Sequence, residues 1–141
     1  MTLRIPRSVR MTPDTTAMSH YIDGFVIPLP VARIEEYRAL ASLSCQGWMD
    51  HGALDYRECV GDDLAAAQGT SFRALAGCAD DETVVFAWIT YPSREARDAI
   101  NAAVMQDPRM ADMMTPGAVP FDCKRMAYGG FTTLVATSHP A

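Results

Sequence analysis

The stretch HGALDYRECVGDD, residues 51–63, holds several side chains that could do chemistry. His51 could act as a general base, since an imidazole exchanges protons near neutral pH. Cys59 could act as a nucleophile if the cation of Arg57, two residues away, favoured its thiolate form. The two aspartates that end the stretch suggest a cation site, although no calcium-loop spacing follows them. These candidates could serve in proton transfer, nucleophilic attack or ion binding, but the stretch contains no motif that is specific for one reaction.

Each of these candidates also has a structural interpretation. A histidine at a helix C-terminus interacts favourably with the helix dipole, typically by about 0.3–1 kcal/mol. A cysteine in a strand is commonly an inert side chain, and turns favour aspartate because its carboxylate bonds to nearby backbone N–H groups. Apart from His20 at its edge, His51 is the one histidine of the predicted domain, and no second histidine or carboxylate stands at ligand spacing from it. We therefore predict no metal and no cofactor.

The composition indicates a single globular domain. The chain has 141 residues, of which 49% are hydrophobic and 21% are charged, as in average soluble domains. Its net charge of −5 argues against a nucleic-acid partner and against an anionic membrane surface, since both attract clustered positive charge. No apolar run reaches the length of a membrane span. The four cysteines form no CxxC pair, and without a secretory leader we expect reduced thiols in a cytoplasmic protein.

The first residues differ in composition from the rest of the chain. Residues 1–19 contain three arginines, many Ser and Thr residues and the internal methionines Met11 and Met18. They lack the apolar core of a signal peptide, and their faint likeness to a transit peptide shows no amphipathic period. We expect either a disordered tail or an over-called start with Met18 as the true initiator. A single ferredoxin-like domain is predicted over residues 20–137, with a short tail at 138–141.

The remaining pattern alternates between strands and helices. Strands are predicted at YIDGFVIP, LDYRECV, TVVFAWITY and KRMAYGGFTTLVA. Residues 31–52 carry apolar side chains at helical spacing and end at a glycine. A second helix is predicted from the N-cap Ser93 to Pro108, followed by one more helical turn, and residues 64–80 are predicted to be a loop with a short helical piece. The order β-α-β-β-α-β predicts an α+β fold, a ferredoxin-like sandwich.

Both faces of the predicted sheet are apolar. In the third strand Val85, Ala87 and Ile89 alternate with Val84, Phe86 and Trp88. Leaving a large apolar side chain in water forgoes about 1.5–3 kcal/mol of burial free energy. The two helices of such a fold cover only one face, so something else must cover the other. We therefore expect a homodimer whose two sheets pack face to face.

Alternation along the strands assigns side chains to the two faces. The helix side is predicted to hold Ile22, Gly24, Val26, Leu54, Tyr56, Val60, Val85, Ala87 and Ile89. Glu58 also falls on this side, either as a residue at its rim or because the alternation slips by one near the turn at Gly61. The second face is predicted to hold Tyr21, Asp23, Phe25, Ile27, Asp55, Arg57, Cys59, Val84, Phe86, Trp88, Met126 and Tyr128. Its mixture of aromatic and charged groups suits a ligand pocket and equally an interface with a satisfied ion pair.

From this assignment we select candidate site residues. The ligand-contacting candidates are Tyr21, Phe25, Phe86 and Trp88, with Arg125 placed to capture an anionic group at the mouth of the cleft. The catalytic candidates are Asp23, His51, Arg57 and Tyr128. We predict no metal ligand among them.

Several long segments resemble one protein family. YIDGFVIPLP, WMDHGALDYRECVGDD, DETVVFAWITYPSREARDAINAAVMQDPRM and PFDCKRMAYGGF together resemble the YbaA-like proteins, a bacterial family of unknown function. The resemblance runs from about Tyr21 to Val135. It implies a ferredoxin-like fold of the dimeric α/β-barrel type, and it implies no activity.

Two classes of function stay open. The first is an uncharacterised cytoplasmic homodimer with a small-ligand cleft and no assignable reaction, in which the second face serves mainly for dimerisation. The alternative is a cofactor-independent monooxygenase or isomerase that acts on a small aromatic or lipophilic molecule. Whether the protein is an enzyme is left open by the sequence, because fold alone does not fix function.

Overall fold

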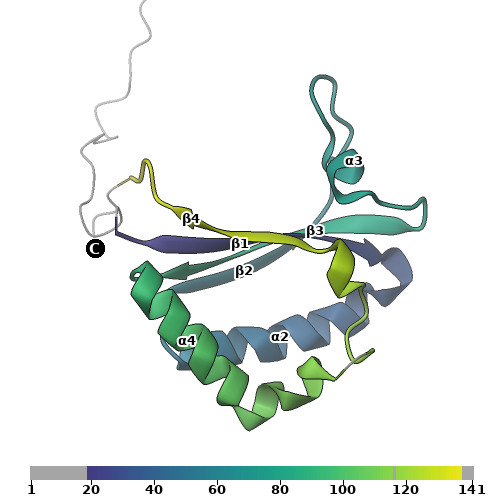
Figure 1. Ribbon diagram of the computed structural model, residues 1–141. Helices are drawn as coiled ribbons and strands as arrows, with labels where there is room; N and C mark the ends of the chain where they lie inside the picture. Colours follow the sequence, from purple (N-terminus) through teal and green to yellow (C-terminus); the bar gives the residue numbers. More distant parts are fainter. Residues whose placement is uncertain (1–18, 116, 138–141) are drawn as a thin grey trace, which may run out of the picture.

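Four strands and two long helices alternate along the chain in the order β-α-β-β-α-β (Figure 1). The computed structural model describes residues 19–115 and 117–137. The strands are β1 (Tyr21–Pro30), β2 (Asp55–Val60), β3 (Glu82–Tyr91) and β4 (Ala127–Thr132); the helices are α2 (Ile34–Asp50), α3 (Phe72–Ala76) and α4 (Arg94–Gln106); the 3₁₀ turns are η1 (Val31–Arg33), η2 (Pro108–Met114) and η3 (Cys123–Arg125). The predicted α+β class is confirmed.

The strands form one open antiparallel sheet in the spatial order β2-β3-β1-β4. β1 lies in the centre and pairs Phe25 with Ala87 of β3 on one side and with Tyr128 of β4 on the other. β2 extends the sheet beyond β3, where Glu58 pairs with Ala87. Phe25, Ala87, Glu58 and Tyr128 therefore lie side by side across the four strands and point to the same face of the sheet.

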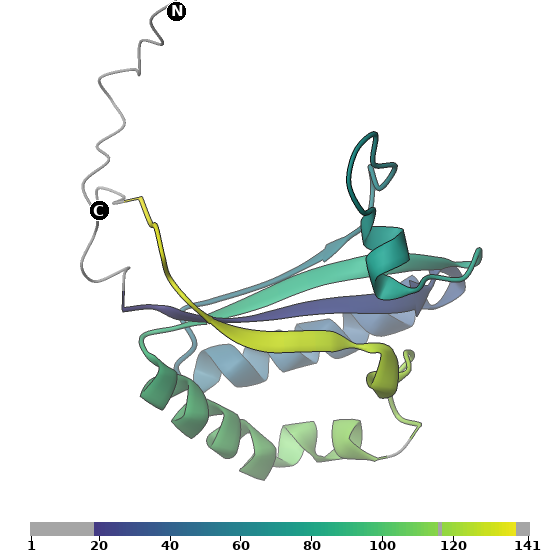
Figure 2. The same cartoon turned by 45° about the horizontal axis from the view of Figure 1, so that its top comes forward.

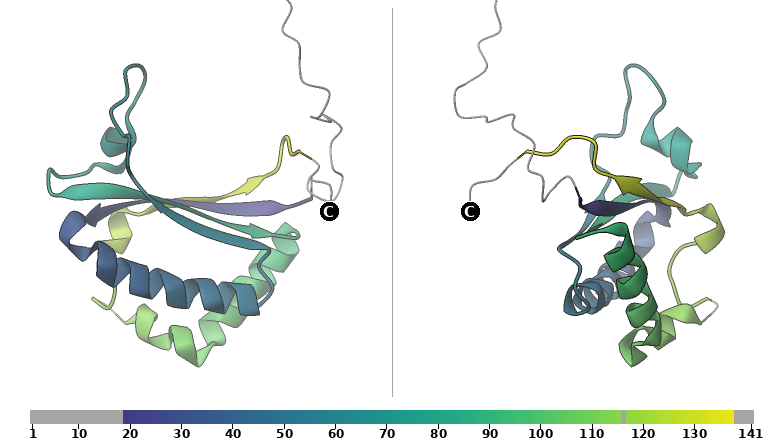
Figure 3. Two further views of the ribbon diagram at one scale, coloured as in Figure 1. Left: turned by 180° about the vertical axis from the view of Figure 1, so that it is seen from behind. Right: turned by 60° about the vertical axis from the view of Figure 1, so that its left-hand side comes forward.

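The two long helices cover one face of this sheet. α2 and α4 lie together beneath the sheet, whereas the short α3 and its connecting loops lie on the opposite face at one end (Figures 1 and 2). The same division is visible from behind and from the side (Figure 3). We call the face covered by α2 and α4 the helix face and the other one the outer face. Within the described ranges, no helix is long and apolar enough to cross a membrane.

The helix boundaries follow local signals. The Ser93 hydroxyl accepts a hydrogen bond of 3.0 Å from the Ala96 N–H at the start of α4, so the predicted N-cap is confirmed. Pro108 begins the separate turn η2, because proline has no N–H with which to continue a helix. α2 ends before Gly52, whose φ of 113° is a conformation that other residues adopt with strain.

The core lies between the sheet and the two helices in two adjoining clusters. One cluster joins the end of β3 to α4 and η2, and the other joins the middle of the sheet to α2. The buried members of the first are Ala53, Ile89, Tyr91, Ile100, Val104 and Met110; those of the second are Ile27, Leu29, Tyr37, Val85 and Ala87. Burial of these side chains provides the main stabilisation of the fold.

The prediction that one alternating set of side chains of β1 and β4 lies on the face away from the helices is wrong. Phe25 and Ile27 pack in the core under the helices, and the register places Tyr128 beside Phe25. Tyr21, Asp23, Phe25, Ile27, Met126 and Tyr128 accordingly belong to the helix face. Both alternating sets of β1 are apolar, so alternation did not distinguish the covered face from the open one. The assignments for β2 and β3, which place Glu58 under the helices, are confirmed.

Two further predictions differ in extent. The final strand, predicted to begin at Lys124, starts at Ala127, and Lys124 and Arg125 lie in η3. The helical piece predicted within residues 64–80 is α3, capped by the Ser71 hydroxyl. The predicted tails, residues 1–18 and 138–141, lie outside the described residues.

Candidate functional site

A cavity of about 450 Å³ lies between the sheet and the helices. Its walls are mostly apolar, and a few polar side chains reach it from the sheet and from both long helices. The apolar walls include Phe25, Ile27, Leu40, Trp48, Ile89, Met105, Phe121 and Met126; the polar groups include Asp23, Tyr37, Ser44, Tyr56, Glu58, Arg97 and Asn101. A volume and lining of this kind are typical of small-molecule sites.

A second hollow of about 480 Å³ adjoins this cavity between α2 and β2. Tyr37, Ala41, Tyr56 and Glu58 line both spaces. Glu58 therefore stands at the boundary between the two hollows, beneath the edge strand of the sheet.

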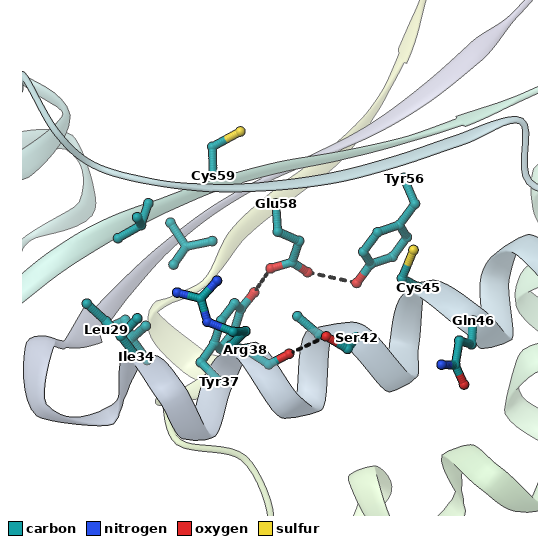
Figure 4. Close-up of a pocket in the computed structure, with 13 residues that line it drawn as sticks. Leu29, Ile34, Tyr37, Arg38, Ser42, Cys45, Gln46, Tyr56, Glu58 and Cys59 are labelled. Atoms are coloured by element: carbon teal, nitrogen blue, oxygen red, sulfur yellow. Dashed lines mark hydrogen bonds between the residues drawn. The ribbon is translucent and has the colours of Figure 1, made fainter.

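The carboxylate of Glu58 is held by two tyrosine hydroxyls (Figure 4). Tyr56, on the same strand face, donates to Oε1 at 2.7 Å, and Tyr37 of α2 donates to Oε2. Figure 4 shows Glu58 pointing from β2 toward α2, while the neighbouring Cys59 points to the other side of the strand. The helix and the strand thus fix one carboxylate at a defined position.

Both tyrosines remain neutral donors. Burial raises the pKa of Tyr37, and the nearby negative charge of Glu58 raises it further. The pKa of Tyr56 is raised by the same two causes in the same order. A phenol with a raised pKa keeps its proton at every physiological pH. The two hydroxyls can therefore donate to Glu58 but cannot act there as bases.

The second carboxylate of the cavity, Asp23, has a cationic partner. Arg97 of α4 donates to Asp23 Oδ1 at 2.8 Å, and its guanidinium lies 4.8 Å from the ring centroid of Tyr21. Nearby, the Trp48 Nε1–H donates to Asn101 Oδ1 at 3.0 Å and to the Tyr91 hydroxyl at 3.1 Å. This end of the cavity is a charge-balanced network that joins the sheet to both helices.

His51 lies away from this cavity. It is the C-cap residue of α2, and its Nε2 lies 2.8 Å from Asp107 Oδ2. Asp107 also binds Arg109 and accepts from the Arg109 N–H, and these donors, Arg109 first and His51 next, lower the pKa of Asp107. His51 is not among the residues that line the two hollows, and its contacts connect the end of α2 to η2.

The outer face holds three of the predicted residues. The guanidinium of Arg57 lies 5.7 Å from the Trp88 ring centroid, and the Trp88 Nε1–H donates to Asp55 Oδ2 at 3.1 Å. Phe86 lies beside Trp88, with 5.6 Å between ring centroids, and meets Phe72 of the α3 segment at 6.0 Å. Despite the contact with Phe72, Phe86 stays 44% exposed.

The predicted set is therefore divided between the two faces. Tyr21, Asp23 and Phe25 line or border the cavity under the helices with Tyr128 at its edge, where the Tyr128 ring stacks on Phe25 at 6.3 Å. Arg57 and the Phe86–Trp88 pair lie on the outer face.

Arg125 binds within its own chain rather than facing a cleft. Its guanidinium donates to both carboxylate oxygens of Glu82, at 2.7 and 2.9 Å, and to the Gly77 carbonyl at 2.8 Å. The Arg125 hydrogen bonds are the main cause that lowers the pKa of Glu82 to about 2. The pair fastens η3 to the start of β3 and the end of α3.

Sequence reasoning did not select the residues that define the site, namely Tyr37, Tyr56 and Glu58. The signal was the position of Glu58 itself, a charged residue in a strand position that alternation assigns to the helix face. A carboxylate there needs donors, and the tyrosines on the facing helix and on the same strand face could have supplied them.

No metal centre is apparent in residues 19–115 and 117–137, where no three His, Cys, Asp or Glu side chains gather as a metal-binding group. The four cysteines, at positions 45, 59, 78 and 123, are free thiols.

Comparison with known proteins gives a family but no activity. Residues 20–123 match the family described as Protein of unknown function (DUF1428). The chain is 41% identical over 115 residues to the Uncharacterized protein YbaA of Escherichia coli (strain K12), a match that covers 82% of this chain and 97% of the relative. The same figures hold for YbaA of Shigella flexneri.

Among solved structures, a Bacillus cereus protein related to NIF3 aligns with a TM-score of 0.34 at 12% identity, over 90% of this chain and 28% of that chain. A likeness this weak does not inform the fold.

Proposed function

The chain belongs to the family described as Protein of unknown function (DUF1428), and from this premise we propose that it is a homodimer that binds a small molecule between its sheet and its helices. The observation that carries the proposal is the cavity of about 450 Å³ with apolar walls and the fixed carboxylate of Glu58. Binding sites commonly combine such walls with a few oriented polar groups.

The proposal includes a ferredoxin-like fold of the dimeric α/β-barrel type. The strand order β2-β3-β1-β4 and the position of α2 and α4 on one face (Figure 1) support the ferredoxin-like part. In this arrangement the outer face of the sheet is open to a second copy.

The exposed apolar side chains of the outer face support the homodimer. The α3 segment covers one end of this face, where Pro28 and Val84 are buried, but Phe86 is 44% exposed and Phe131 is 60% exposed. Covering large apolar side chains gains about 1.5–3 kcal/mol each. A symmetric dimer meets this need, since each copy presents the same patch to the other.

Ligand binding is tested by filling the cavity. Ala41 lines both hollows, so Ala41→Phe should occupy the ligand volume and weaken the binding of phenethyl alcohol about tenfold or more. Ala39 lies on the exposed side of the same helix, and Ala39→Phe is the matched control. Isothermal titration of the wild-type protein and both variants is the measurement. Equal affinity in all three would overturn the cavity as the ligand site.

One observation favours a second candidate, an isomerase. Glu58 presents a fixed carboxylate to an apolar space, and a carboxylate so placed can take a proton from a carbon of a bound ligand. Acetophenone in heavy water is a suitable probe, because removal of a methyl proton and its return as deuterium leave the molecule otherwise unchanged. Deuterium uptake that the wild-type protein accelerates and Glu58→Gln abolishes is the expected result; uptake at the uncatalysed rate would refute it.

We also propose a cytoplasmic location. The free state of all four cysteines supports it, since such thiols persist in reducing compartments. Cell fractionation against a periplasmic and a cytoplasmic marker tests it, and co-fractionation with the periplasmic marker would refute it.

A further inference from the structure

We propose that Glu58 anchors a protonated amine at the head of a small apolar ligand. This inference rests on the proposed function, because it names the chemical class that the same cavity would take.

The carboxylate of Glu58 has unused acceptor capacity. A carboxylate offers about four lone-pair directions on its two oxygens. Tyr56 and Tyr37 each donate one hydrogen bond, to different oxygens. Each oxygen can therefore accept a further donor from a molecule in either hollow, since Glu58 lines both.

Glu58 differs from the other carboxylate of the cavity in its charge balance. Asp23 forms an ion pair with Arg97 at 2.8 Å. Glu58 forms no ion pair with any residue in the described part of the chain. Arg38, which lines its hollow, is paired with Glu35 at 3.0 Å. A half-buried carboxylate without a counter-charge favours a cation. The protein supplies that cation for Asp23, and a ligand can supply it for Glu58.

The surrounding groups keep this preference intact. Tyr37 and Tyr56 are neutral phenols that orient the carboxylate without cancelling its charge. Their hydroxyls also prevent the carboxylate from turning away, so an ammonium group would meet a preorganised acceptor. Trp48 also lines the cavity, with its ring 6.4 Å from that of Tyr56, and an aromatic ring near the site can attract a cation.

The remaining walls suit an apolar body. Phe25, Ile27, Phe121 and Met126 line the cavity beyond Glu58. The volume of about 450 Å³ is roughly three times the cavity of about 150 Å³ that takes up benzene in another protein. An arylalkyl amine with one or two rings therefore fits both the apolar walls and the single negative charge.

Binding of three matched probes tests the assignment. Phenethylamine, phenethyl alcohol and hydrocinnamate share one aromatic body and differ in the charge of the head group. We expect affinities in the order amine, alcohol, carboxylate, with the amine about tenfold tighter than the alcohol, as for a charge-assisted hydrogen bond. In Glu58→Gln the amine and the alcohol should bind equally. Glu36→Gln removes the same charge from the exposed side of α2, where Glu36 pairs with Arg33 outside both hollows, and should leave the order unchanged.

The outcomes separate this inference from the proposed function. Equal affinity of amine and alcohol for the wild-type protein, or an amine preference that survives Glu58→Gln, overturns the amine assignment alone. Failure of all three probes to bind overturns the cavity as a ligand site and with it the proposed function. Should Glu58→Gln fail to fold, the order of the three probes on the wild-type protein still decides, because tighter binding of hydrocinnamate overturns the assignment.

Discussion

Tyr56 and Glu58 lie two residues apart on one face of β2, and the Tyr56 hydroxyl donates to the Glu58 carboxylate at 2.7 Å. Side chains at this spacing in a strand point to the same side of the sheet. The helix opposite adds Tyr37 to the other oxygen of the same carboxylate. A local pair on a strand is thus completed by one residue from α2, and the three side chains form the polar centre of the cavity.

Removal of either phenol hydroxyl should destabilise the fold. In Tyr37→Phe and in Tyr56→Phe the Glu58 carboxylate loses one of its two donors, at an expected cost of about 1–3 kcal/mol in the free energy of unfolding. The costs should not add in the double variant, because both hydroxyls serve one carboxylate. Urea unfolding provides the measurement.

The control for the phenols is Tyr128→Phe. Tyr128 is 73% exposed, so loss of its hydroxyl should change the free energy of unfolding by less than about 0.5 kcal/mol. If the losses in the free energy of unfolding for Tyr37→Phe and Tyr56→Phe add exactly in the double variant, the two hydroxyls do not share a partner.

Two neighbouring glycines of β4 should respond differently to alanine. A Cβ at Gly130 would overlap the buried ring of Tyr21, whereas a Cβ at Gly129 would meet only Phe131, at 3.9 Å. Gly130→Ala should therefore cost about 1–3 kcal/mol as overpacking, and Gly129→Ala should be neutral or slightly stabilising. Thermal unfolding of both variants is the test, and equal melting temperatures would contradict the packing of Tyr21 against β4.

Acid should weaken the Glu82–Arg125 pair. The folded-state pKa of Glu82 is lowered from 4.5 to about 2, so its stabilisation is complete above pH 4.5 and is lost as the pH falls toward 2. Unfolding midpoints in urea between neutral pH and pH 3 should therefore fall more steeply for the wild-type protein than for Glu82→Gln. Asp107, whose pKa is also lowered, adds to the acid sensitivity of both proteins.

Arg125→Ala should remove the same pH dependence and cost about 1.5–3 kcal/mol at neutral pH, since it deprives a buried carboxylate of charged donors. Glu35→Gln, an exposed change on α2, is the control with wild-type pH dependence. A Glu82→Gln profile as steep as the wild-type profile would show that this pair does not control acid stability.

A charge on the outer face should break the proposed dimer. Phe86→Lys places an ammonium group in the apolar patch, where desolvation on association is costly. Met49 is 40% exposed, close to the 44% of Phe86, but lies in α2 on the helix side, so Met49→Lys is the matched control. Light scattering should give a monomer for Phe86→Lys and a dimer for Met49→Lys. A wild-type monomer at micromolar concentration would refute the dimer itself.

The order of elements could be predicted from the sequence because its signals are local. The cap at Ser93, the stop at Pro108 and the dense β-branched run of β3 each act within a few residues. The face of β2 could also be predicted, since Tyr56 and Val60 alternate with Asp55 and Arg57. In β3 both alternating sets are apolar, so alternation alone does not account for the correct assignment there.

The site could not be predicted in the same way. β1 is apolar at both alternating sets of positions, so its covered face depends on pairing with β3 and on packing against α2. The Glu58 site depends on Tyr37, which is 21 residues distant in sequence. Asp23 and Arg97, separated by 74 residues, meet only in the folded chain. His51 and Arg57 are close in sequence, and both are candidates for one site, but the fold separates them.

The crystal structure of the complex with para-bromophenethylamine tests the central claim most directly, because bromine is located by its anomalous scattering independently of the protein atoms. We predict the bromine between the sheet and α2, near Phe121 and Met126, with the amine nitrogen at hydrogen-bond distance from a Glu58 oxygen. Bromine bound on the outer face beside Phe86 and Trp88, with the cavity under the helices filled by side chains, would contradict the account.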